Sequence, residues 1–142
     1  MDLTQSFPRS PKTKMSGLVM VPRMIDKARA YTSKTLGEYI FPCPLDKIIL
    51  GFLGADCKEF THLAQKLTEE EIALWINKKC LHRSQDDKKR VNQKLLERKP
   101  DTQESWDRFN ELRDKINPTL KNITTWVDLL ELDENRMPPK IP

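Results

Sequence analysis

Three charged residues close together, Arg23, Asp26 and Lys27, could bind an anion. On a helix, Arg23 and Lys27 lie one turn apart on the same face, and Asp26 lies three residues from Arg23. Two such cations can hold a phosphate or a carboxylate while the acid orients them. The structural alternative is a solvated face, on which pairs between Asp26 and its arginine neighbours add about 0.3–0.5 kcal/mol each.

A proline-rich connector, residues 38–44, follows this helix and contains Tyr39 and Cys43. Cys43 stands between two prolines just before a second predicted helix, and a cysteine near a helix N-terminus can be a reactive thiolate. A nucleophile needs a base, and the chain has two histidines, His62 and His82. The alternative is that Cys43 is a small buried residue and that Asp46 caps the second helix.

Metal ligands are poorly spaced along the chain. A zinc site could use Cys43, Cys57, Cys80 and His82, but only Cys80 and His82 are close in sequence and no CxxC pair occurs. The chain also lacks a glycine-rich phosphate loop, a Ser–His–Asp pattern and an H-E-x-x-H motif. We therefore expect no metal and no cofactor.

Basic residues concentrate between residues 78 and 100, which carry nine Lys or Arg against three acids. A helix predicted over 84–99 would place several of them on one surface. No aromatic residue interleaves with these cations, and the common nucleic-acid signatures are absent. The zone is typical of a solvated outer face, and weak nucleic-acid binding is the alternative.

The elements that position these residues are predicted to be helices. Apolar side chains recur at three- and four-residue steps, most clearly at Trp106, Phe109, Leu112 and Ile116. Capping signals precede several of these stretches. The predicted order is an extended arm over 1–20, a domain of six to seven helices over 21–135 and a Pro-rich tail over 136–142. The first helix is expected to begin near Pro22 and to end at Gly37, and later helices are expected to begin near Leu45 or Asp46, at Asp56, Thr68, Ser84 and Asp101, and near Thr125.

Composition agrees with this organisation. The chain has 142 residues, a net charge of +4 and only four glycines, too few for a typical sandwich or barrel. Its three cysteines do not form a secreted disulfide framework, and neither a signal peptide nor a membrane-spanning apolar stretch is recognisable. We expect a compact, all-α, single-domain bundle that is soluble in the reduced cytoplasm and makes no membrane contact.

Several short motifs together resemble one protein family. They comprise Arg9-Ser10-Pro11, Gly17-Leu18, residues 22–30, Gly37-Glu38-Tyr39, residues 43–46, Phe52-Leu53-Gly54, Trp75 and residues 125–134. In combination they resemble the bacterial domain-of-unknown-function family DUF5069, from about residue 8 to residue 136. The resemblance implies a single soluble helical domain and brings no activity, cofactor or catalytic residue.

The preferred hypothesis is a non-catalytic binding or adaptor domain that recognises a protein or a small anionic ligand. Its expected surface joins the first helix to the connector and the next helix start. An enzyme using Arg23, Asp26, Lys27 and a Cys43 thiolate is one alternative, and weak nucleic-acid binding by helix 84–99 is another. The candidate binding residues are Arg23, Asp26, Lys27, Tyr39, Cys43 and Asp46.

Overall fold

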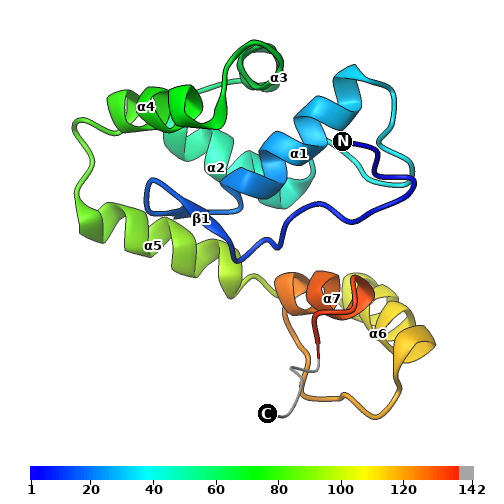
Figure 1. Cartoon of the computed structure of the whole chain (residues 1–142). Coiled ribbons are helices and arrows are strands. Elements are labelled where there is room, and N and C mark those ends of the chain that lie inside the picture. Colours follow the sequence, from blue (N-terminus) through cyan, green and yellow to red (C-terminus); the bar gives the residue numbers. More distant parts are fainter. Residues whose placement is uncertain (138–142) are drawn as a thin grey trace, which may run out of the picture. The chain divides into compact units, whose positions relative to one another are not determined.

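The computed structural model describes residues 1–137, and these residues are mostly helical (Figure 1). This confirms the predicted mostly-α fold. No helix in the described part of the chain is long and apolar enough to cross a membrane. The helices are α1 Val21–Thr32, α2 Pro44–Leu53, α3 Cys57–Lys66, α4 Glu69–Lys79, α5 Gln85–Leu96, α6 Gln103–Ile116 and α7 Trp126–Asp133.

Side-chain caps set most of the helix starts, as the sequence predicted. The Asp56 carboxylate accepts the backbone N–H of Glu59 at 2.7 Å and begins α3. Thr68 and Glu71 form a reciprocal capping box at α4, and the Thr125 hydroxyl caps α7. Each cap satisfies a backbone donor that the first turn of a helix leaves free.

The end of α1 differs from the prediction. The helix stops at Thr32, whereas Gly37 was expected to close it. Lys34 takes the left-handed backbone conformation with φ 59°, and the backbone N–H of Thr35 donates to the Ala30 carbonyl at 2.8 Å. This return bond closes the last turn in the manner usually reserved for glycine. Because glycine is the usual sequence signal for such a helix end, the sequence did not predict that Lys34 would take this position after α1.

The N-terminal arm contains a short hairpin that was not predicted. Strand β1, Lys14–Met15, pairs antiparallel with β2, Leu18–Val19. The turn residues Ser16 and Gly17 both have positive φ, 53° and 80°, as a tight two-residue hairpin turn requires. The prediction of an extended arm over residues 1–20 did not include this turn or the pairing of the two strands.

The chain divides into two compact units, Met1–Asn92 and Gln93–Pro142. In the first, α1 packs closely on α3 and is buried along most of its length. In the described part of the second, Phe109 packs edge-on against Trp106 and Trp126, with ring centroids 5.7 and 5.1 Å away. The predicted single domain over 21–135 remains a prediction, and the tail predicted over 136–142 lies mostly outside the described residues.

Candidate functional site

The charged face of α1 is buried. Arg23 is 1% exposed, Lys27 is 2% exposed, and Asp26 is buried beside them. The alternative of a solvated helix face is therefore wrong for these three residues. A buried charge is costly unless it is paired and hydrogen-bonded, so the partners of each side chain define what the site can do.

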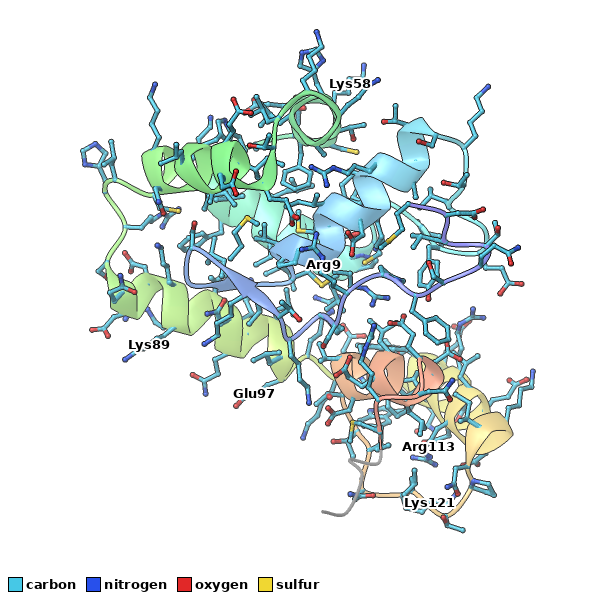
Figure 2. All side chains as sticks on the ribbon, viewed as in Figure 1. Arg9, Lys58, Lys89, Glu97, Arg113 and Lys121 are labelled. Atoms are coloured by element: carbon cyan, nitrogen blue, oxygen red, sulfur yellow. The ribbon has the colours of Figure 1, made fainter. Side chains whose placement is uncertain are left out.

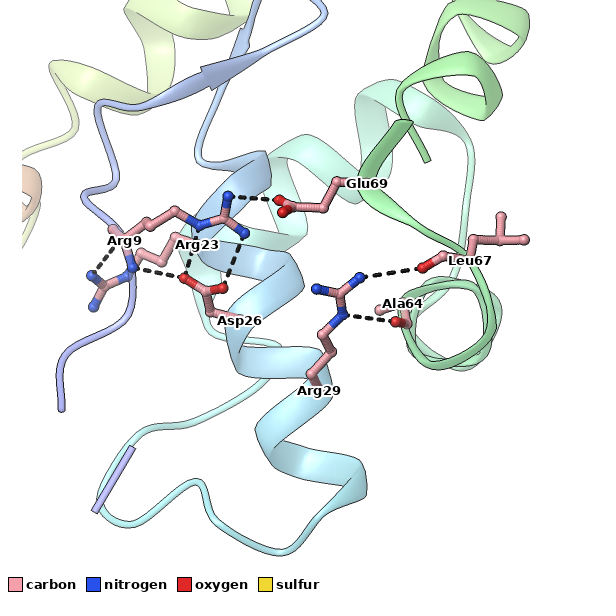
Figure 3. Close-up of polar contacts among 7 residues, drawn as sticks. All are labelled: Arg9, Arg23, Asp26, Arg29, Ala64, Leu67 and Glu69. Carbon is pink, nitrogen blue, oxygen red and sulfur yellow. Dashed lines mark hydrogen bonds and ion pairs between the residues drawn. The ribbon is translucent and has the colours of Figure 1, made fainter. Parts of the chain in front are cut away.

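Asp26 holds the N-terminal arm against α1 (Figure 3). Its carboxylate accepts three hydrogen bonds from Arg9, from the backbone N–H at 2.8 Å and from the side-chain Nε and Nη2 atoms at 3.1 and 3.0 Å. The remaining Nη1 atom of Arg9 pairs at 2.6 Å with Glu69, the first residue of α4. Partial burial disfavours the Arg9 charge, but the hydrogen bonds and charges of Asp26 and Glu69 outweigh it and raise its pKa.

Arg23 connects the arm to the connector. Its Nη1 atom donates to the backbone carbonyl of Arg9 at 3.3 Å (Figure 3). Its guanidinium carbon lies 5.5 Å from the centroid of the Tyr39 ring, a cation–π distance. The structure therefore brings together two of the candidate residues, the buried Arg23 and the half-buried Tyr39.

Lys27 forms a buried ion pair with Asp46. Its Nζ atom lies 2.6 Å from Asp46 Oδ2, and the two side chains are 3% and 0% exposed. The same Oδ2 atom accepts the backbone N–H of Cys43 at 2.8 Å, so Asp46 also completes a capping box at the start of α2. Lys27 Nζ further contacts Cys43 Sγ at 3.5 Å and lies 5.9 Å from the Phe41 ring centroid.

The surroundings of Cys43 disfavour its thiolate form. Burial, and secondly the carboxylate of Asp46, raise the pKa of its thiol, and the positive charge of Lys27 offsets this only in part. Proximity to a helix N-terminus does not by itself produce a thiolate here.

All six predicted site residues thus lie in the first unit and form two groups. Arg23, Asp26 and Tyr39 belong to the group organised by Arg9, and the others belong to the group organised by the Lys27–Asp46 pair. Sequence reasoning did not assign Arg9 and Glu69 to the site. No spacing rule links them to Asp26, because Arg9 lies 17 residues before it and Glu69 lies on a later helix.

Arg29, also on α1, has a local structural role. Its Nε and Nη2 atoms donate to the backbone carbonyls of Ala64 and Leu67 at 2.9 and 3.2 Å (Figure 3). These carbonyls belong to the last turn of α3 and to its C-terminal cap residue, Leu67, where the helix has no backbone donors of its own to satisfy them. Arg29 therefore caps the C-terminal end of α3.

The predicted basic helix is α5, and its polar residues divide into two sets. Asn92 accepts the backbone N–H of Val19 at 3.0 Å and donates to the Gly17 carbonyl at 2.9 Å, while Lys88 donates to the Ser16 carbonyl at 2.9 Å. Both side chains hold the hairpin. Lys89 points away from it (Figure 2), and Lys89, Arg90 and Lys94 are exposed to solvent.

The comparisons with known proteins identify one family. Its profile, described as "Domain of unknown function (DUF5069)", matches residues 5–136. No curated protein matches the chain. The matched range includes both groups of buried charges, α5 and nearly all of the second unit.

Proposed function

The chain belongs to the DUF5069 family, whose description names no activity, and from its own residues we propose that it is a non-catalytic domain that recognises a protein partner. The proposed contact surface is the connector, residues 38–44, together with the start of α2. The observation that carries this proposal is the exposure of Ile40, 69%, in a loop that is fixed on both sides.

The residues around Ile40 are held in place by contacts with buried side chains. Tyr39 rests on the buried Arg23, Phe41 is buried near Lys27, and the Cys43 backbone is bonded to Asp46. A loop held this way loses little conformational entropy when it binds, and an apolar side chain on it gains from being covered. The buried charges therefore support the recognition surface and do not contact the partner.

The same burial argues against a small anion as the ligand. Lys27 is already neutralised by Asp46, and Arg23 is 1% exposed and stacked under Tyr39. An incoming phosphate would have to displace these partners and to be desolvated in the same step. A protein surface that covers Ile40 requires neither change.

The chemistry of Cys43 also favours binding over catalysis. A raised thiol pKa lowers the thiolate fraction at neutral pH, and the thiolate is the nucleophile. His62 and His82 are both exposed on other elements. The iodoacetamide labelling rate at Cys43 should be slower than that of free cysteine, and a faster rate would support the enzyme alternative.

A site-specific photocrosslinker tests the surface directly. We would place p-benzoylphenylalanine at Ile40 and, as a matched control, at Leu74 on α4, which is 68% exposed. Irradiation of cells that naturally produce the chain should give a discrete crosslinked protein from position 40 and none from position 74. Absence of a product from position 40, or the same product from both, would contradict the proposed surface.

A further inference from the structure

The contact between Cys43 and Lys27 joins a sulfur and an amine from different elements. Sγ and Nζ are 3.5 Å apart, and Asp46 Oδ2 holds both Nζ and the Cys43 backbone. The other oxygen of this carboxylate, Oδ1, is buried and has no hydrogen-bond partner in the part of the chain that the structure describes. The structure thus holds together an amine that can act as a nucleophile, Lys27, an oxidisable sulfur, Cys43, and a carboxylate oxygen that can accept a proton, Asp46 Oδ1.

We propose that Cys43 and Lys27 form a sulfenamide, a covalent sulfur–nitrogen bond, when a peroxide oxidises Cys43. The inference is independent of any protein partner. It makes the pair a modification site, in which oxidation links α1 covalently to the N-terminus of α2.

The reaction has two balanced steps. In the first, the Cys43 sulfur bonds to one peroxide oxygen, the O–O bond breaks, and water leaves; sulfur is oxidised by two electrons and becomes a sulfenic acid. In the second, Lys27 passes a proton to Asp46, and its nitrogen lone pair attacks the sulfur. The S–O bond then breaks with its electron pair on oxygen, which takes the proton from Asp46 and leaves as water. The new nitrogen–sulfur group loses one further proton to solvent.

The geometry favours the second step over competing ones. The atoms that must bond are already at the upper end of the separation of about 3–3.5 Å found in near-attack arrangements. Asp46 lies 2.6 Å from the nitrogen that must be deprotonated, and its Oδ1 atom remains able to carry a proton. Capture by the amine removes the sulfenic acid before a second peroxide can convert it to the irreversible sulfinic acid.

Cys57 supplies an internal comparison. It is half-buried, as Cys43 is, but its sulfur lies 3.9 Å from the hydroxyl of Thr61, which does not form a sulfenamide. The raised pKa of Cys43 makes the first step slow, so the experiment needs excess peroxide. Slow oxidation does not alter the fate of the sulfenic acid once it forms.

The test uses the full chain, hydrogen peroxide and mass spectrometry of the intact protein and its tryptic peptides. The expected product has lost two hydrogens, joins the Lys27 peptide to the Cys43 peptide, resists tryptic cleavage after Lys27 and reverts with dithiothreitol. Dimedone, which traps sulfenic acids, should label Cys57 readily and Cys43 weakly.

The control is Lys27→Arg, which keeps the positive charge beside Asp46 but lacks the nucleophilic amine. Dimedone labelling of Cys43 should rise several-fold in this variant, with circular dichroism verifying its fold. Equal dimedone labelling of Cys43 in the wild type and Lys27→Arg would overturn the proposal. So would a linked product that retains oxygen, or sulfinic acid at Cys43 without any link. If the variant does not fold, the wild-type peptide map decides: oxidised Cys43 without a dithiothreitol-reversible link to Lys27 would overturn the proposal.

Discussion

At the scale of single residues, the buried charges of α1 are stable only as pairs. Lys27 and Asp46 each lose almost all contact with water, and their mutual attraction and hydrogen bonds offset that loss. Removing one partner of such a pair lowers the stability of the fold by more than the intact pair contributes, because the remaining charge stays buried without a counter-charge. The surface pair of Asp87 and Arg90 contributes little to stability, since water solvates either charge when the other is removed.

Lys27→Met should therefore destabilise the first unit strongly, by about 3–5 kcal/mol, because Asp46 is left without its counter-charge. Arg90→Met is the matched control and should leave the free energy of unfolding nearly unchanged. Urea unfolding of the two variants measures both values. Similar small effects would mean that Lys27 and Asp46 are not buried together in solution.

The raised pKa of the Cys43 thiol predicts that stability depends on pH. Because burial raises its pKa, the folded protein binds the thiol proton more tightly than the unfolded chain does. This contribution is complete below the ordinary thiol pKa of about 8.5 and is lost as the pH rises through the raised value. Between pH 7 and 10 the melting temperature of the wild type should fall more steeply than that of Cys43→Ala. Parallel curves for the two proteins would contradict the buried placement of this thiol.

At the scale of elements, the hairpin is held to α5 by side chains and not by strand pairing alone. Two residues per strand make a weak ladder, and a two-stranded hairpin is marginal in water. Asn92 supplies both a donor and an acceptor to the chain around Gly17 and Val19. A buried asparagine on a largely polar helix thus has a clear structural task.

Asn92→Ala should cost about 1–3 kcal/mol, because the buried N–H of Val19 loses its acceptor. Gln93→Ala, at the exposed neighbouring position, should change stability by less than about 0.5 kcal/mol. Hydrogen exchange at the Val19 amide provides a local readout and should accelerate only in Asn92→Ala. Unchanged exchange at Val19 would show that the hairpin does not depend on this contact.

The same scale separates what sequence could predict from what it could not. Helix starts at Asp56, Thr68 and Thr125 were predictable because each cap is a local hydrogen bond within four residues. The end of α1 was not, since Lys34 adopts a conformation for which glycine is the usual signal. The six candidate residues lie in the first unit, in two groups. Their burial escaped prediction because it depends on Arg9 and Glu69, which reach Asp26 only through tertiary packing.

At the scale of the whole molecule, the two units offer separate reporters. Trp75 lies in Met1–Asn92, whereas Trp106 and Trp126 lie in Gln93–Pro142, around Phe109. Whether the chain unfolds as one cooperative domain, as the sequence predicts, or as two can therefore be read from fluorescence.

Phe109→Ala removes the centre of the second cluster and should destabilise that unit by about 3–5 kcal/mol. In a Trp75→Phe background, fluorescence should report a large drop in the urea midpoint. With Trp75 as the remaining tryptophan, the midpoint should move much less. Equal shifts from both reporters would favour a single cooperative domain over two units.

The ion pairs of α1 also have an order in time, set by the direction of protein synthesis. Arg9 precedes Asp26, so this acid emerges from the ribosome with its partner already made. Lys27 must wait for Asp46, which follows 19 residues later, or about 1–4 s at ordinary elongation rates. During that interval Lys27 gains nothing from being buried. We therefore expect α1 to complete its packing in the nascent chain only after the start of α2 has emerged.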